Sequence, residues 1–218
     1  MIHLNKTILF DLDGTLTDSG EGILNCVELA LRHFNLPVPD REALRVFVGP
    51  PLHDTFVKFG VPEENVEEAV AVFRSRYTTT GKFENTPYPG IHDLLQTLKG
   101  QGYILLVATS KPETLANEIL DKFELSQHFD QICGATLDRS RITKEDVIAY
   151  LLAQTNGDDN MLMVGDTAFD VIGAAAHGIP TVGVSWGYGE VADMENAGAV
   201  AIVNTMDELY EYLTKRAC

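Results

Sequence analysis

The sequence predicts an α/β fold, in which a parallel β-sheet with crossover helices is interrupted by a long helical insertion near the N-terminus. Short apolar runs recur along the 218 residues, and from the second run onward they alternate with helical patterns. The segment 11–102, between the first two runs, has almost no strand character. Because a crossover between parallel strands needs only about a dozen residues, this gap is long enough to hold a separate domain.

The apolar runs have the length of buried strands. They are TILF (7–10), YILLVA (103–108), QIC (131–133), MLMVG (161–165), TVGV (181–184) and AIV (201–203). Helical spacing of apolar residues follows at 112–123, 144–155, 168–178 and 206–215. This alternation predicts crossover connections and therefore a parallel sheet.

The gap reads as helical, with helices expected at 21–34, 40–48, 52–59 and 63–80. The stretch NTPYPG (85–90) marks a boundary, because two prolines and a glycine disfavour continuing helix, and a further helix is expected at 91–99. We therefore expect residues 1–17 and 85–218 to form the α/β core and residues 18–84 to form the inserted helical domain.

Composition narrows the class of protein. With 32 acidic and 16 basic residues the net charge is −16, which disfavours binding to a nucleic-acid polymer. No apolar stretch approaches the roughly 18 residues of a membrane span, and the N-terminus has no signal-peptide pattern, so a cytoplasmic protein is expected. Cys26, Cys133 and Cys218 lack the paired spacing of a disulfide framework or a thiolate zinc site.

The first strand ends in DLDGT, where Asp11 and Asp13 follow an apolar run. A strand alternates faces with period two, so both carboxylates point the same way, roughly 6–7 Å apart at Cα. An ordinary explanation is a strand ending in an Asp-Gly turn. The functional interpretation is that a cation lies between the carboxylates and leaves one oxygen free as a nucleophile.

Three further strands are followed by distinctive polar residues. Thr109 and Ser110 follow the second run, Lys144 lies between the third strand and its helix, and Asp166 and Asp170 flank a helix start after the fourth. Alone, each could be a helix cap or a solvated charge. Together, at the carboxyl ends of parallel strands, they predict a divalent-cation pocket beside a phosphate pocket.

With DLDGT, Thr109–Ser110, Lys144 and GDTAFD in this order, the chain resembles the haloacid dehalogenase-like superfamily of aspartate-nucleophile phosphatases. The stretches GPPL (49–52), LDRSRITKEDVI (137–148) and GVSWGYG (183–189) resemble its phosphoglycolate phosphatase and 5′-nucleotidase-like group. The resemblance implies a Rossmann-like parallel sheet core with an inserted α-helical cap domain. Lys144 is followed by Glu145 where many relatives have proline, so a different backbone path could present the lysine.

The resemblance also implies roles for the site residues. Asp11 would be the nucleophile that becomes an aspartyl phosphate, and Asp13 the general acid and base. Mg²⁺ would be held by the Asp11 carboxylate, the Asp13 backbone carbonyl and Asp166. Thr109, the Ser110 amide and Lys144 would bind the phosphate oxygens. Asp170 would support the outer shell of the metal or Lys144.

The expected activity is Mg²⁺-dependent hydrolysis of a small phosphate ester, and two alternatives stay open. A sugar phosphomutase would share the same catalytic residues, and a non-catalytic protein would only bind a phospho-ligand. We expect a 5′-nucleotide slightly ahead of phosphoglycolate, because the basic residues of the insertion that could pair with a substrate carboxylate are scattered, and because the chain resembles the 5′-nucleotidase-like members of the group. It does not distinguish a monomer from a homodimer.

Overall fold

In a computed structural model of the chain, residues 7–155 and 160–215 are described, and they form two compact units. The sheet unit comprises residues 1–17 and 87–218, and the helical unit comprises residues 18–86. The chain passes between them twice, through the short strands β2 (Thr17–Asp18) and β3 (Thr86–Pro87), which pair with each other.

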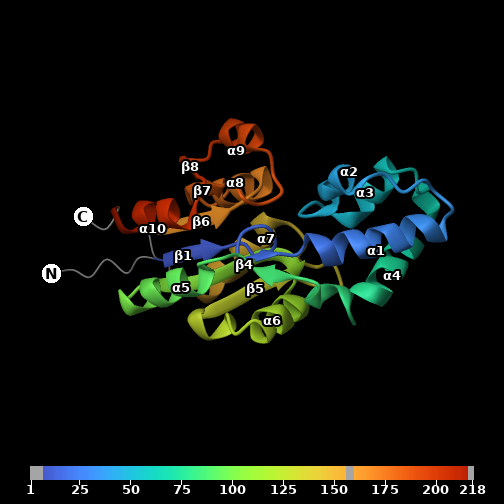
Figure 1. Cartoon of the computed structure of the whole chain (residues 1–218). Coiled ribbons are helices and arrows are strands. Elements are labelled where there is room, and N and C mark those ends of the chain that lie inside the picture. Colours follow the sequence, from blue (N-terminus) through green and yellow to red (C-terminus); the bar gives the residue numbers. More distant parts are fainter. Residues whose placement is uncertain (1–6, 156–159, 216–218) are drawn as a thin grey trace. The chain divides into compact units, whose positions relative to one another are not determined.

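The sheet unit is built on six parallel strands in the order β5-β4-β1-β6-β7-β8 (Figure 1). The strands are β1 (Thr7–Phe10), β4 (Ile104–Pro112), β5 (Gln131–Ala135), β6 (Met161–Gly165), β7 (Thr181–Val184) and β8 (Ala201–Val203). β1 lies between β4 and β6, and from it the later strands extend in both directions. This is the topological switch point at which open α/β sheets bind ligands.

Helices cover both faces of this sheet. They are α5 (Ile91–Gly100), α6 (Glu113–Lys122), α7 (Lys144–Gln154), α8 (Ala168–Ala175), α9 (Val191–Ala197) and α10 (Met206–Lys215), with a 3₁₀ turn, η4 (Ser126–His128), after α6. The predicted parallel α/β fold is confirmed.

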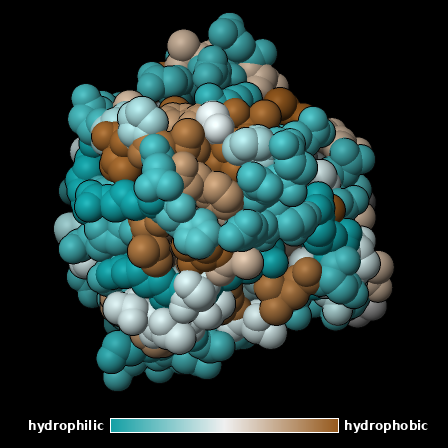
Figure 2. Space-filling model, turned by 90° about the vertical axis from the view of Figure 1, so that its right-hand side faces the viewer, coloured by the Kyte–Doolittle hydropathy of each residue, from teal (hydrophilic) through white to brown (hydrophobic). Residues whose placement is uncertain are grey.

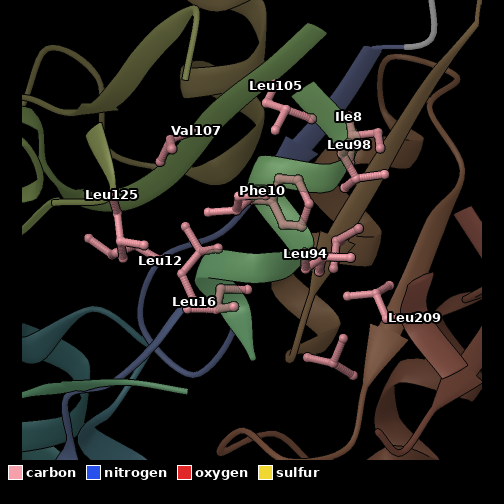
Figure 3. Close-up of a cluster of buried hydrophobic side chains, with 14 of the residues drawn as sticks. Ile8, Phe10, Leu12, Leu16, Leu94, Leu98, Leu105, Val107, Leu125 and Leu209 are labelled. Carbon is pink, nitrogen blue, oxygen red and sulfur yellow. The ribbon is translucent and has the colours of Figure 1, made fainter. Parts of the chain in front are cut away.

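Strand alternation divides the core into two clusters. Ile8 and Phe10 of β1 pack with apolar residues of α5, α6 and α10 (Figure 3), whereas Leu9 packs on the opposite face with residues of α7 and α8. Because β1 is buried on both faces, its sequence is a continuous apolar run rather than an alternating one.

The helical unit contains α1 (Gly20–His33), α2 (Arg41–Leu44), α3 (Leu52–Lys58) and α4 (Val66–Tyr77). The 3₁₀ turns η1 (Arg45–Phe47), η2 (Glu63–Asn65) and η3 (Gly81–Phe83) complete it. Phe47 packs against Phe56 and Phe59, with ring centroids 5.0 and 4.8 Å away, and Phe73 stacks on Tyr77 at 5.2 Å. Its aromatic residues are therefore mainly core.

Several predicted boundaries differ from the structure. The helix expected at 40–48 ends at Leu44 and continues as η1, and the one expected at 63–80 begins with η2 before α4. The strand expected at 103–108 runs on to Pro112, because after an irregularity at Thr109 it pairs again with Ala135 of β5. Helix α9 was not predicted, since its seven residues, VADMENA, are too few for a clear periodic pattern.

The surface is mainly hydrophilic on the face shown in Figure 2, and the described cysteines are free thiols. Figure 2 shows small hydrophobic patches among hydrophilic residues on the face that it presents. Among the described residues, none of the helices has both the length and the apolar character needed to cross a bilayer. Cys26 and Cys133 are buried free thiols, and Cys218 lies outside the described residues.

Candidate active site

Asp11 and Asp13 stand where β1 ends and the chain turns. The Asp11 amide continues the sheet by donating to the Val164 carbonyl of β6 at 3.0 Å, and then the Leu12 carbonyl accepts from the amides of Leu16 and Thr17. Gly14 allows the turn, because its φ of +84° suits glycine and a Cβ there would overlap the Asp166 carboxylate. The turn thus brings β1 directly against the acidic end of β6.

Lys144 neutralises part of the charge around Asp11. Its Nζ lies 2.8 Å from Asp11 Oδ1 and 2.7 Å from Asp170 Oδ1, and it donates to the Ala108 carbonyl at 2.8 Å. Burial alone would lower the pKa of Lys144, but these two carboxylates raise it above its ordinary value. For Asp11, burial is the largest effect and raises the pKa to about 6, although the charge of Lys144 opposes the rise.

Asp166 is fully buried at the end of β6. Its Oδ1 accepts from the Thr15 hydroxyl at 3.1 Å and its Oδ2 from the Tyr188 amide at 2.8 Å. Burial raises the pKa of Asp166 well above its ordinary value, and the charges of Asp170 and Asp11 raise it further. This carboxylate is therefore held in place although its surroundings disfavour its charge.

Asp170 has two structural partners. Its Oδ2 accepts from the Thr167 amide at 3.0 Å and the Thr167 hydroxyl at 2.8 Å, which caps α8, while Oδ1 contacts Lys144. The Asp170 side chain therefore caps the start of α8 and also orients Lys144. A Cβ at Gly165 would overlap this carboxylate, so glycine is needed for the close approach.

Asp11, Asp166 and Asp170 offer carboxylate oxygens within 4.8 Å of one another. Asp11 Oδ1 and Asp170 Oδ1 are buried, and each forms an ion pair with Lys144. Among the described residues, neither oxygen has a partner that meets hydrogen-bond geometry. Three buried carboxylates and one ammonium leave an excess of negative charge. Hard oxygen ligands with excess negative charge fit a divalent cation such as Mg²⁺, and the group contains Asp170 in addition to the expected Asp11 and Asp166.

The side chain of Asp13 lies in a different environment. Its Oδ2 forms an ion pair with Nζ of Lys111, and the two side chains are only 14% and 5% exposed. Lys111 was not among the predicted site residues. The sequence offered no clear signal for it, because the strand was expected to end at residue 108 and only the structure extends β4 through Lys111 to Pro112.

Thr109 and Ser110 differ in their surroundings. Thr109 is 1% exposed, and its hydroxyl accepts from the Lys111 amide at 3.3 Å and also lowers the pKa of Asp11 by hydrogen bonding to it. Ser110 is less buried and lies inside β4, because the strand runs past the expected end at residue 108 to Pro112. The structure thus brings Thr109 to Asp11.

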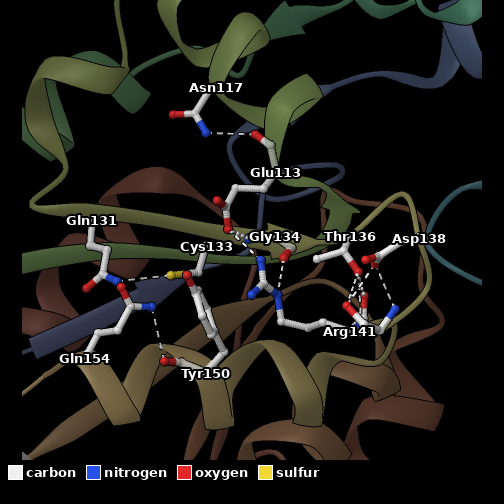
Figure 4. Close-up of polar contacts among 11 residues, drawn as sticks. Glu113, Asn117, Gln131, Cys133, Gly134, Thr136, Asp138, Arg141, Tyr150 and Gln154 are labelled. Atoms are coloured by element: carbon white, nitrogen blue, oxygen red, sulfur yellow. Dashed lines mark hydrogen bonds and ion pairs between the residues drawn. The ribbon is translucent and has the colours of Figure 1, made fainter.

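Arg141 holds the loop that leads from β5 to α7, and Figure 4 shows its contacts with Glu113 and Gly134. Arg141 donates to the Gly134 carbonyl at 2.6 Å and to Glu113 at 2.8 Å, and its guanidinium lies 3.7 Å from the centre of the Tyr150 ring. The Thr143 hydroxyl then caps α7 by accepting from the Asp146 amide, and Lys144 is the first helical residue. This capping box fixes the start of α7.

The segment after β7 also contacts the site. Trp186 donates its ring N–H to the Thr15 carbonyl at 3.3 Å, and a Cβ at Gly187 or Gly189 would overlap Asp166. In the sequence this stretch is recognisable only as a family feature. This stretch holds Asp166 through its backbone, and the side-chain types in the sequence do not reveal such a contact.

Known proteins are similar to this chain in sequence and in fold. The chain is 44% identical to tyrosine-protein kinase PtkA of Mycobacterium tuberculosis over 211 residues, covering 95% of this chain and 72% of that protein. It is 43% identical to a 5′-nucleotidase of Pseudomonas aeruginosa over 184 residues, covering 84% and 83% of the two chains. The crystal structure of a predicted phosphatase from Clostridium acetobutylicum matches with a TM-score of 0.92 at 43% identity, covering 97% and 99%.

The match to a family is equally extensive. Residues 8–184 match the haloacid dehalogenase-like hydrolases, a range that begins in β1 and ends with β7 and so includes every carboxylate described above. With the six-stranded parallel sheet and the acidic cluster at its switch point, this match identifies the chain as a member of the haloacid dehalogenase-like hydrolase family.

Proposed function

We propose that this protein is a Mg²⁺-dependent phosphomonoester hydrolase that works through an aspartyl phosphate. The observation that carries the proposal is the pair of aspartates at the end of β1 with separate partners. Asp11 lies against Lys144 in the acidic cluster, and Asp13 lies against Lys111. One carboxylate is thereby placed as a nucleophile and the other as a proton carrier.

In the first step an Asp11 oxygen attacks phosphorus, and the bond from phosphorus to the leaving oxygen breaks as Asp13 donates a proton to that oxygen. In the second step Asp13 takes a proton from water, which attacks phosphorus and releases Asp11 as a carboxylate. Thr109, the Ser110 amide and Lys144 hold the non-bridging oxygens throughout.

Asp11, Asp166 and the Asp13 backbone carbonyl would hold the metal, with Asp170 in support through Lys144 and the start of α8. When bound, Mg²⁺ supplies positive charge that offsets the carboxylates and the phosphoryl oxygens. We assign the role of a cap to the helical unit, because it is inserted between β1 and α5 of the sheet unit and has its own core.

For the substrate we favour a 5′-nucleotide over phosphoglycolate. The 43% identity to a protein named 5′-nucleotidase supports this order, against 32% to a phosphoglycolate phosphatase of Caulobacter vibrioides. The buried aromatics of the helical unit do not add support, because Phe47, Phe56 and Phe73 are core and offer no free ring face for a base.

The test is phosphate release from 5′-nucleotides, phosphoglycolate, sugar phosphates and pyrophosphate, with Mg²⁺ and with excess chelator. We expect activity only with Mg²⁺ and inhibition by Ca²⁺, whose looser coordination misplaces the nucleophile. A kcat/KM for phosphoglycolate more than about tenfold above the best nucleotide, roughly 1.4 kcal/mol, reverses the substrate order. No release from any ester supports the non-catalytic alternative instead.

Phosphoryl transfer to an acceptor other than water is the second candidate. The relative named tyrosine-protein kinase PtkA favours a protein tyrosine as acceptor, and a phosphomutase would return the group to a sugar. Either reaction would form the same aspartyl phosphate. Labelled ATP or sugar phosphate with a tyrosine-containing protein separates the candidates, because label in inorganic phosphate indicates hydrolysis and label on protein or sugar indicates transfer.

A further inference from the structure

Lys111 is a buried charged residue to which the proposed reaction steps give no role, although it contacts Asp13. It is 8% exposed, lies in β4 two residues after Thr109, and forms its ion pair with Asp13 in the turn that follows the neighbouring strand β1. A buried ammonium is costly unless it is paired, so the contact constrains both side chains.

The two carboxylate oxygens of Asp13 are not equivalent. Oδ2 is the partner of Lys111, whereas Oδ1 is buried and accepts no hydrogen bond from any described residue. The lysine therefore fixes the rotation of the carboxylate and leaves one oxygen available. An unsatisfied buried acceptor is costly, and its presence beside the nucleophile suits an atom that exchanges a proton during turnover.

The backbone around Lys111 is itself held firmly. Its amide donates to the Thr109 hydroxyl at 3.3 Å, and a Cβ on Gly134 would lie 2.5 Å from its carbonyl oxygen. Gly134 in turn donates its amide to Glu113 at 3.1 Å and accepts from Arg141 (Figure 4). The contacts of Arg141 and Glu113 with Gly134 therefore hold both the loop that leads to Lys144 and the backbone of β4 at Lys111.

We propose that Lys111 is a positioning residue for Asp13, and that it binds Oδ2 so that Oδ1 is the oxygen that gives and takes the proton. The inference rests on the proposed function, which names Asp13 as the proton carrier. In the first step the proton leaves Oδ1 for the leaving oxygen as the ester bond breaks. In the second step Oδ1 takes a proton from the attacking water, and the ion pair with Lys111 holds the carboxylate form in place between the steps.

Leaving-group dependence tests this role. p-Nitrophenyl phosphate needs little protonation of its leaving oxygen, whereas an alkyl phosphate such as glycerol phosphate needs it fully. We expect Lys111→Met to lower kcat/KM for the alkyl ester at least about tenfold more than for the aryl ester. Lys111→Arg should restore part of the difference, because the guanidinium can still reach Oδ2.

A matched control and a double mutant sharpen the measurement. Lys99→Met removes another ion-paired lysine of the sheet unit, 2.8 Å from Asp130, and should leave the ratio between the two esters unchanged. In an Asp13→Asn background, Lys111→Met should cost less than about twofold, because a residue that acts through Asp13 has nothing left to position.

The outcomes separate the two ideas. Equal loss on both esters, or a rise in KM alone, overturns the positioning role and makes Lys111 a substrate contact. If Lys111→Met does not fold, Lys111→Gln replaces it, and an unchanged ester ratio in that variant overturns the inference. If the wild-type chain releases no phosphate, the proposed function fails and this inference fails with it; if Asp13→Asn shifts the ratio and Lys111 variants do not, only this inference fails.

Discussion

Two clusters of charged residues, one in each unit, use similar side chains with opposite results. In the helical unit the Arg76 guanidinium binds both oxygens of Glu84, at 2.7 and 2.6 Å, and Asn25 donates to the same carboxylate at 2.9 Å. In the sheet unit Asp11 and Asp170 pair with Lys144, and Asp166 offers a third carboxylate oxygen within 4.8 Å of theirs. The first cluster balances charge and the second does not.

The pKa values follow this difference. Hydrogen bonds from Arg76 lower the pKa of Glu84 to about 2, so its surroundings favour the charged form. Burial raises the pKa of Asp11 to about 6 and that of Asp166 well above its ordinary value, so the sheet unit holds charges that it disfavours. A chain keeps such an arrangement at a cost in stability, which indicates chemistry rather than folding.

The largest expected effect comes from the nucleophile. Asp11→Asn preserves shape but removes the attacking charge, so turnover should fall below about 1% of the wild-type rate while the fold persists. Phosphate release and a thermal melt measure the two parts. The matched control is Asp93→Asn, an exposed aspartate of α5 in the same unit, which should change neither.

Neutralising Asp166 should separate stability from activity. In Asp166→Asn the amide can donate to the Thr15 hydroxyl and still accept from the Tyr188 amide, so the contacts survive and the repulsion falls. Without metal we expect Tm to rise by about 2–4 °C, near 1 kcal/mol for a chain of this size. The Mg²⁺ concentration for half-maximal activity should rise at least about tenfold, and more than in Asp170→Ala.

A lower Tm in metal-free Asp166→Asn would contradict the view that charge repulsion dominates this cluster. The matched control is Asp121→Asn in α6, which removes an exposed carboxylate of the same unit. It should leave both Tm and the Mg²⁺ requirement unchanged, because an exposed charge is well solvated and its interactions contribute little to stability.

Metal removal should affect the two clusters differently. An ion that binds only the folded chain stabilises it by about 2.7 kcal/mol at one hundred times its dissociation constant. Mg²⁺ should therefore raise the Tm of the wild-type chain and of Glu84→Gln alike, and chelator should reverse the rise. In Asp166→Asn the shift should be much smaller, and an undiminished shift would place the ion elsewhere.

The smallest effect is expected in the balanced cluster. Glu84→Gln removes the charge partner of Arg76, whose side chain is 29% exposed, and should destabilise the chain by about 1 kcal/mol. Because the folded pKa of Glu84 is lowered, its contribution is complete above the unfolded value of about 4.5 and is lost as pH falls toward 2. Acid titration of Tm should therefore be flatter in this pH range for Glu84→Gln than for the wild type, and parallel curves would contradict the assignment.

The local periodicity of the sequence was enough to predict much of this molecule. Buried strands read as apolar runs, and the strand period of two is sufficient to place Asp11 and Asp13 on one face. The carboxyl ends of parallel strands share one edge of a sheet, so Thr109, Lys144 and Asp166 were expected near them. In each case the relevant information lies within a few consecutive residues.

Only the tertiary structure decided which side chain partners which. Lys111 meets Asp13 because β4 lies beside β1, and Asp170 divides its oxygens between Thr167 and Lys144 because α7 starts beside α8. The backbone of Tyr188 holds Asp166 from a loop that carries no catalytic side chain. These contacts join residues distant in sequence, and their formation depends on strand order and close backbone approach, which local pattern and residue type do not encode.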